Sequence, residues 1–315
     1  MFGLGIYTED QYLQMGPERR FAGPKVAYNL LRIGENPSEE QIRAFEDISV
    51  TLRTSNGTFR TTFRNRFEDV DALFLAILPR HFRAETELRI EDRAVSHGLT
   101  SAEWGKRILP LFPRAEIEAS DLVLQLIELS TAGGEKFITE ADGTPLQYIK
   151  PPCVVSLYHR ESMRNPIRCL VAAQARERFR RLALPEGWTE GSPGPGFQVS
   201  AIPYIHPEAA ALALSDPRFR FRQRSVFEIS PAACHVVRTM NIFNRDYFSD
   251  ERLAEGFRAI FESLRPGGIW VAGRTLEEDL SNHASIFQRT ENGWKILDRL
   301  GGGWGLESMA VELFR

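Results

Sequence analysis

Residues 234–275, CHVVRTMNIFNRDYFSDERLAEGFRAIFESLRPGGIWVAGRT, decide the fold of this chain. They begin with a largely apolar run at 234–240 that is typical of a buried strand. Ser249, followed by two acids, predicts the start of a helix, and the apolar residues after it recur at helical spacing. Pro-Gly-Gly at 266–268 ends this helix, and a second buried strand follows. Strand, helix, tight turn and strand form a βαβ unit, which requires that the two strands run parallel.

This segment resembles the region between the fourth and fifth strands of class I S-adenosylmethionine (SAM)-dependent methyltransferases. The strand, Asn241 at its end, the amphipathic helix and the Leu-Arg-Pro-Gly-Gly turn at 264–268 carry the resemblance. Two further features most resemble the chemotaxis-receptor methyltransferase branch. Arg238 precedes the asparagine, and Tyr247-Phe248 follows it, with two or three more residues between the asparagine and the tyrosine than in that branch. The resemblance implies a Rossmann-like seven-stranded α/β sheet, S-adenosylmethionine as cofactor and methyl transfer as the activity.

A second segment, residues 87–103, predicts a short buried strand, a turn and a helix. Its sequence D-x-x-V-S-x-G-x-T-S at 92–101 stands where these methyltransferases carry D-x-G-x-G-x-G, although only one glycine is present and His97 replaces a small or acidic residue. Small residues let the backbone approach a cofactor, and a helix N-terminus offers N–H donors to its carboxylate. An ordinary strand-to-helix turn is the alternative interpretation, because a single glycine is a weak signal.

Asp121 ends the next expected strand and lies 23 residues after Gly98 (121 − 98). An acid at this place in nucleotide-binding α/β folds accepts hydrogen bonds from ribose hydroxyls, at a spacing of roughly 20 residues from the glycine turn. The alternative is that Asp121 only caps a helix expected over 122–129.

The chain ends in three expected strands at 284–288, 294–300 and 308–314. Short glycine turns join them, so they must pair antiparallel, because a parallel pairing needs a long crossover. An antiparallel end to an otherwise parallel sheet favours a methyltransferase over a dehydrogenase. The resemblance covers roughly residues 85–130 and 215–315.

The domain organisation expected from the sequence has two parts. Residues 1–83 form an N-terminal cap of helices and a hairpin at Asn56-Gly57, and residues 84–315 form the SAM-binding domain with a β-rich insertion at about 131–200. Such a cap often covers the substrate in the resembled family.

Composition narrows the class of protein. The chain has 315 residues, 43% of them apolar and 26% charged, with a net charge of −3. A near-neutral chain is not expected to coat nucleic acid. Its three cysteines fit neither a disulfide framework nor a zinc site, so no metal is expected. Without a leader-like start or a long apolar run, no membrane span is expected and the cytoplasm is the expected location.

The resemblance assigns roles to side chains at the carboxyl edge of the sheet. The catalytic candidates are Asn241, Asp246 and Tyr247. The cofactor-binding candidates, with Ser225 against the adenine, are Ser96, His97, Gly98, Thr100, Asp121, Ser225, Val226 and Asn241. The substrate candidates, of which Arg274 suits an anionic group, are Asn244, Arg245 and Arg274.

Three functions remain open from the sequence. The first is a SAM-dependent methyltransferase acting by in-line substitution on a small molecule or a protein carboxylate, with the acceptor unidentified. The second is a catalytically inactive SAM-binding protein with a regulatory or assembly role. The third, a nicotinamide oxidoreductase, is disfavoured by the antiparallel end of the sheet. The sequence does not indicate the oligomeric state.

Overall fold

The computed structural model describes residues 5–14, 25–34, 36–57, 60–161, 165–182, 196–230 and 234–314. The chain forms two compact units, each assembled from two separate stretches. The five-stranded unit comprises residues 1–61 and 123–207, and the seven-stranded unit comprises residues 62–122 and 208–315. A cap over residues 1–83 and a cofactor domain over residues 84–315 stay predictions.

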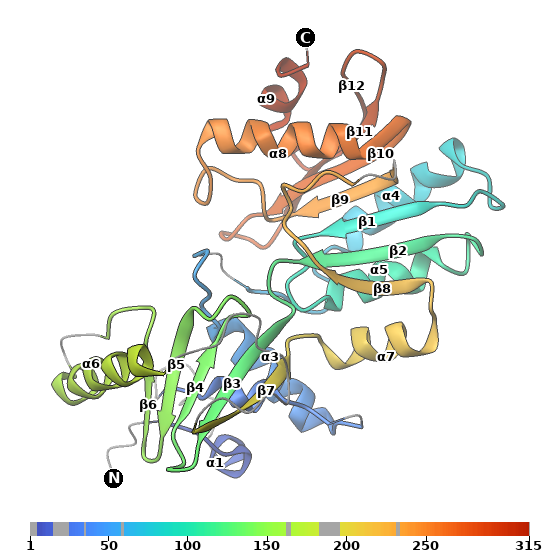
Figure 1. Cartoon of the computed structure of the whole chain (residues 1–315). Helices are drawn as coiled ribbons and strands as arrows, with labels where there is room; N and C mark the ends of the chain where they lie inside the picture. Colours follow the sequence, from blue (N-terminus) through green and yellow to red (C-terminus); the bar gives the residue numbers. More distant parts are fainter. Residues whose placement is uncertain are drawn as a thin grey trace. The chain divides into compact units, whose positions relative to one another are not determined.

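The seven-stranded unit is built on a mostly parallel sheet (Figure 1). Its strands are β1 (Arg89–Arg93), β2 (Glu116–Asp121), β8 (Phe219–Gln223), β9 (Cys234–Met240), β10 (Leu264–Thr275), β11 (Asn282–Arg289) and β12 (Trp294–Leu300). They lie in the order β12-β11-β10-β9-β1-β2-β8, and β11 runs opposite to the other six strands, so that the β10–β11 and β11–β12 pairs are antiparallel. When the strands of this unit are numbered 1 to 7 along the chain, their order in the sheet from β8 is 3-2-1-4-5-6-7, which is an extended Rossmann-like order. The predicted fold class is therefore confirmed.

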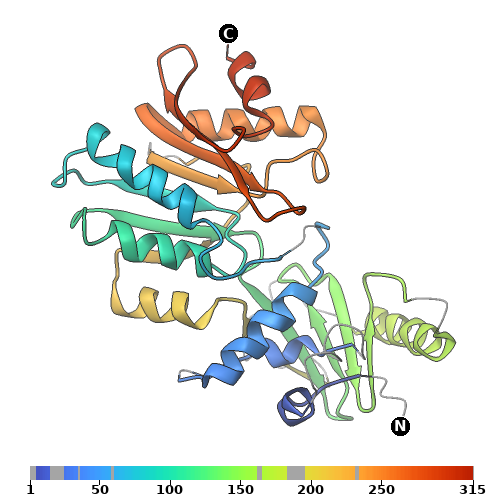
Figure 2. The same cartoon turned by 180° about the vertical axis from the view of Figure 1, so that it is seen from behind.

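Helices cover both faces of this sheet, as the front and back views show (Figures 1 and 2). On one face lie α4 (Glu68–His81) and α5 (Leu99–Ile108), which contact each other through Phe74 and Trp104. On the other lie α8 (Asp250–Ser263) and α9 (Glu307–Glu312), whose core includes Trp270 of β10. Helix α7 (Pro207–Ser215) precedes the edge strand β8. The predicted α8 is confirmed, and Ser249 caps it by accepting a hydrogen bond from the Arg252 N–H.

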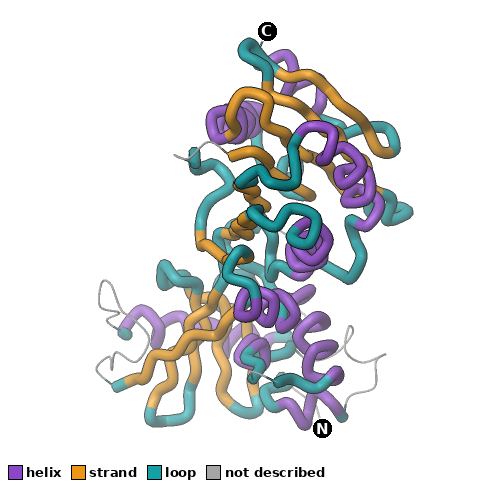
Figure 3. The backbone as a smooth tube through the Cα atoms, turned by 90° about the vertical axis from the view of Figure 1, so that its right-hand side faces the viewer, coloured by secondary structure: helices purple, strands orange, loops and turns teal. Residues whose placement is uncertain are grey.

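The five-stranded unit contains an antiparallel sheet in the order β6-β5-β4-β3-β7. Its strands are β3 (Gln125–Thr131), β4 (Lys136–Thr139), β5 (Pro145–Lys150), β6 (Cys153–Ser156) and β7 (Phe197–Pro203). Its helices are α1 (Glu9–Leu13), η1 (Tyr28–Leu31), α3 (Glu39–Thr51) and α6 (Pro166–Arg181). Helix α6 shares an apolar core with one face, while α1, η1 and α3 share a second core with the other, so helices flank this sheet on both sides (Figure 3).

Two predicted elements are wrong. Residues 308–314, predicted as a strand, lie mostly in α9, because Leu306 and Ala310 are buried at helical spacing. Residues 122–129, predicted as a helix, lie mostly in β3, which begins at Gln125. Both faces of β3 are covered, so Leu126 and Ile127 are buried consecutively, and an apolar run without alternation cannot be distinguished from a helix by periodicity.

Asn56-Gly57 makes a turn with Gly57 in the left-handed region, but no strand flanks it within 50–57 and 60–63. None of the helices in the described part of the chain combines the length and apolar character needed to cross a bilayer. Within the same described ranges, no three His, Cys, Asp or Glu side chains gather as a metal site requires.

Candidate functional site

The order of the parallel strands reverses between β1 and β9, and the site candidates lie at or after the carboxyl ends of β1, β2, β8, β9 and β10. Strand β1 leads into α5 on one face of the sheet, and β9 leads into α8 on the other. The two loops therefore separate at the carboxyl edge. In open α/β sheets ligands bind at this switch point.

The turn after β1 has an unusual backbone. Ala94, Ser96 and Gly98 have φ of 62°, 57° and 81°, so three of five successive residues are left-handed. Residues with side chains rarely adopt this conformation, and such strain gathers at functional sites. Within this turn, the Gly98 N–H donates to the Val95 carbonyl at 3.0 Å, which closes the turn on itself. Gly98 is required for a packing reason as well, because a Cβ there would lie 2.5 Å from the Phe221 ring.

Asp121, at the end of β2, is joined to this turn. Its Oδ2 accepts a hydrogen bond of 2.8 Å from the Ser96 N–H, and the neighbouring Val95 N–H donates to the Ser120 carbonyl at 3.1 Å. Asp121 is thus beside the turn, as predicted. The alternative that it caps a following helix is wrong, because β3 follows instead.

The start of α5 is buried. His97 and Thr100 are almost fully covered, and the Thr100 carbonyl accepts a hydrogen bond from Arg238. Ser101 donates its hydroxyl to Asp92 Oδ2 at 2.6 Å. The buried side chains on this part of the predicted cofactor turn therefore also fix α5 against the sheet.

Arg238 of β9 is the centre of a buried ion cluster that the sequence analysis missed. Its Nε and Nη2 donate to Asp92 at 3.0 and 2.5 Å, and its Nη1 donates to Asp71 at 2.7 Å. The guanidinium also lies 4.1 Å from the centre of the Trp104 ring. Burial raises the pKa of Asp71 to about 7, even though Arg238 opposes the shift. The available signal was the charge within two predicted strands, Glu91, Asp92 and Arg93 in β1 and Arg238 in β9.

The opposite face of β1 holds a second ion cluster. Glu91 accepts hydrogen bonds from Arg93 and from Arg224, the residue after β8. Burial alone would raise the pKa of Glu91, but the two guanidinium groups hold it at about 2. Glu91 is therefore a permanently ionised partner at neutral pH and cannot act there as a proton donor.

Ser225 and Val226 follow Arg224 near the end of β2. The Arg224 N–H donates to the Asp121 carbonyl at 2.9 Å, which brings this loop beside Asp121. The Ser225 hydroxyl accepts a hydrogen bond from the Phe227 N–H at 3.3 Å and so also shapes its own turn.

The loop after β9 starts at Asn241, which has a φ of 61°. The Asn241 Oδ1 accepts from the Thr275 N–H at 2.7 Å, and its Nδ2 donates to Thr275 Oγ1 at 3.2 Å. Further along, Asn244 Oδ1 accepts from the N–H groups of Asp246 and Tyr247. Asn244 thus folds the loop that carries two catalytic candidates.

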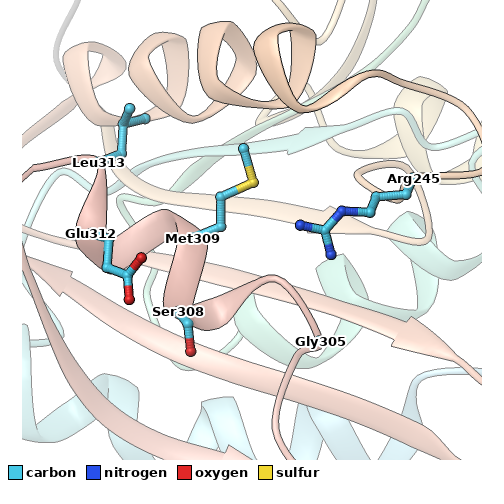
Figure 4. Close-up of a pocket in the computed structure, with 6 residues that line it drawn as sticks. All are labelled: Arg245, Gly305, Ser308, Met309, Glu312 and Leu313. Carbon is cyan, nitrogen blue, oxygen red and sulfur yellow. The ribbon is translucent and has the colours of Figure 1, made fainter.

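The two substrate-candidate arginines pair with different acids. Arg274 lies 3.0 Å from Asp246, and both side chains are substantially exposed. Arg245 instead lies 2.8 Å from Asp250 at the start of α8. Arg245 also reaches into a surface groove of about 540 Å³ beside α9 (Figure 4). The lining residues of this groove are Arg245, Gly305, Ser308, Met309, Glu312 and Leu313.

No family model matches the sequence, and no curated protein matches it. A Plasmodium falciparum protein assigned as a protein-L-isoaspartate O-methyltransferase, crystallised with S-adenosyl-L-homocysteine, aligns over 86% of this chain and 83% of its own, at 11% identity and a TM-score of 0.33. An O-methyltransferase family protein from Burkholderia thailandensis aligns over 86% of this chain and 53% of its own, at 15% identity and a TM-score of 0.32. Similarity at this level does not identify a function.

Proposed function

We propose that this chain is a SAM-dependent methyltransferase that acts on a small molecule or on a protein carboxylate. One observation carries the proposal: the strained turn at 94–98 is hydrogen-bonded to Asp121 at the switch point of a Rossmann-like sheet. The N–H groups at the start of α5, beside the Asp121 carboxylate, suit a ligand with a carboxylate at one end and a ribose at the other.

The residues present fit such a cofactor. Backbone N–H groups at the start of α5 would receive the carboxylate. Asp121 would accept hydrogen bonds from ribose hydroxyls, and a carboxylate accepts several bonds at once, so the bond from Ser96 is compatible with this role. Thr100 and Val226 would supply walls, and Ser225 would lie toward the adenine, whereas His97 has no exposed surface and would support the start of α5.

The cofactor would supply a methyl group that its positively charged sulfur already activates. The task left to the chain is to align an acceptor in line with that methyl group and to exclude water. We propose Asn241, Asp246 and Tyr247 for this alignment. A catalytic base is needed only when the acceptor binds in its protonated form. A carboxylate acceptor is already deprotonated and needs no base.

Arg274 would hold the acceptor. Its ion pair with Asp246 is exposed, so an acceptor carboxylate can exchange with Asp246 for the same guanidinium. Arg245 and Asn244 would border the entrance from the same loop. We further propose a relation to the chemotaxis-receptor methyltransferase branch, in which the buried Arg238 before Asn241 supports the loop by its ion pairs with Asp71 and Asp92.

Calorimetry with SAM, S-adenosylhomocysteine and NAD tests the cofactor. We expect both sulfur nucleosides to bind and NAD not to bind. Binding of NAD alone would overturn the proposal in favour of an oxidoreductase. Release of S-adenosylhomocysteine with a panel of carboxylate acceptors tests catalysis, and binding without turnover on protein and small-molecule acceptors would favour the inactive regulatory or assembly protein.

A further inference from the structure

A continuous set of hydrogen bonds connects Asn241 to the residues before α4. Thr275, at the end of β10, bonds both atoms of the Asn241 amide. The Thr275 hydroxyl donates to Asn282 Oδ1 at 2.8 Å, across the paired ends of β10 and β11. The Asn282 Nδ2 donates to the Arg66 carbonyl and to Asp69 Oδ1, each at 2.7 Å. Arg66 closes the set by donating its Nε to Thr275 Oγ1 at 3.1 Å.

At the centre of this set, every hydrogen-bonding position of the Thr275 hydroxyl has a partner. A threonine hydroxyl offers one donor and two acceptor positions, and the Thr275 hydroxyl donates once and accepts from Asn241 and Arg66. Asn282 uses both hydrogens of its amide nitrogen. Thr275 and Asn282 are both buried. The direction of every hydrogen bond is therefore fixed, and so is the way in which the Asn241 amide faces.

The same set leaves part of Asn241 available. An asparagine amide has two N–H donors and two lone pairs on its oxygen. Among the described residues, one donor and one lone pair of Asn241 are engaged, both by Thr275. One N–H and one lone pair remain to face a ligand at the carboxyl edge of the sheet.

We propose that Thr275 and Asn282 are positioning residues that orient the Asn241 amide for the cofactor and acceptor, an inference that rests on the proposed function. A side chain fixed before binding loses less conformational freedom when the ligand arrives. Arg66 before α4 and Asp69 in its first turn take part, so a segment far from Asn241 in sequence contributes to its orientation.

The test replaces Thr275 with valine, which keeps the shape but removes the hydroxyl, and Asn282 with alanine. We expect T275V to weaken SAM binding by about fivefold to tenfold, as the loss of roughly one net hydrogen bond predicts. T275S restores the hydroxyl and is expected to bind SAM nearly as the unchanged protein does. T290V is the matched control, because Thr290 uses its hydroxyl on the Gly293 carbonyl at the opposite edge of the sheet.

Hydrogen exchange of residues 241–248 gives a readout that does not depend on SAM. We expect faster exchange there in T275V and N282A, and unchanged exchange in T290V and T275S. Unchanged exchange and unchanged SAM affinity in T275V would overturn the positioning role. If the unchanged protein does not bind SAM, the proposed function fails, and the exchange comparison still decides whether Thr275 and Asn282 hold Asn241.

Discussion

At the residue scale, the Asp121 carboxylate has two roles. We assign it to binding the ribose, and it also accepts a hydrogen bond from the Ser96 N–H. Replacing Asp121 with alanine removes both. We expect the affinity for SAM to fall about tenfold or more, since a buried charged hydrogen bond contributes roughly 1.5–3 kcal/mol. Calorimetry gives the affinity directly.

Replacing Asp121 with asparagine separates the hydrogen bond from Ser96 from the negative charge. D121N keeps an oxygen that can accept the Ser96 N–H but removes the charge, so we expect an affinity between those of the unchanged protein and D121A. An affinity for SAM that is the same in all three proteins would remove Asp121 from the site.

Gly98 shows how a single residue is constrained by its surroundings. A Cβ at Gly98 would lie 2.5 Å from the ring of Phe221, and the residue is also left-handed. We expect G98A to lower the free energy of unfolding by about 1–3 kcal/mol, the usual cost of overpacking, in addition to the strain of a positive φ.

G267A is the matched control for this change. Gly267 lies in the same seven-stranded unit and has a similar φ of +80°, but nothing lies within 4 Å of the position its Cβ would take. We expect urea unfolding to show a smaller loss for G267A than for G98A. Equal losses would mean that backbone strain, and not the contact with Phe221, determines the cost.

At the element scale, β1 is a central strand that carries buried charge on both faces. Glu91 pairs with arginines on one face, and Asp92 pairs with Arg238 on the other. Breaking such a pair leaves an uncompensated buried charge, whereas the intact pairs contribute modestly to stability. The ion clusters therefore fix how α4, α5 and the loop after β8 pack on the sheet.

The Asp71 carboxyl makes stability depend on pH. Burial raises its pKa from 3.8 to about 7. The folded protein therefore holds this proton more tightly than the unfolded chain, so the contribution is fully present below about pH 4 and is lost as the pH rises to about 7. We expect the stability of the unchanged protein relative to D71N to be greater at pH 5 than at pH 8. Urea unfolding at both values checks this, and a difference independent of pH would contradict it.

At the scale of the whole molecule, the chain leaves the seven-stranded unit after Leu122 and returns at Glu208. In the five-stranded unit the Tyr204 N–H donates to the Leu124 carbonyl at 2.8 Å, so the outgoing and returning strands are neighbours. A short linker can therefore replace residues 123–207. Each unit has its own apolar core, as an independently folding domain requires.

We expect a shortened protein, residues 62–122 joined to 208–315 by a short Gly-Ser linker, to fold and to bind SAM. All of the proposed cofactor residues belong to the seven-stranded unit. Circular dichroism checks the fold and calorimetry checks binding. A folded shortened protein that does not bind SAM would mean that the five-stranded unit contributes to the site.

The sequence by itself determined three features: the βαβ unit at 234–275, the strand, turn and helix of β1 and α5, and the antiparallel β11–β12 pair. All three follow from local periodicity and turn chemistry. It also predicted that Asp121 would lie beside the turn at 94–98. Only the tertiary structure decided that β3 is a strand of a second sheet and that 307–312 is a helix, since burial on both faces or in a short segment leaves no distinctive period. It alone revealed the partners of Arg238 and Thr275, because contacts between residues far apart in the chain leave no local pattern to read.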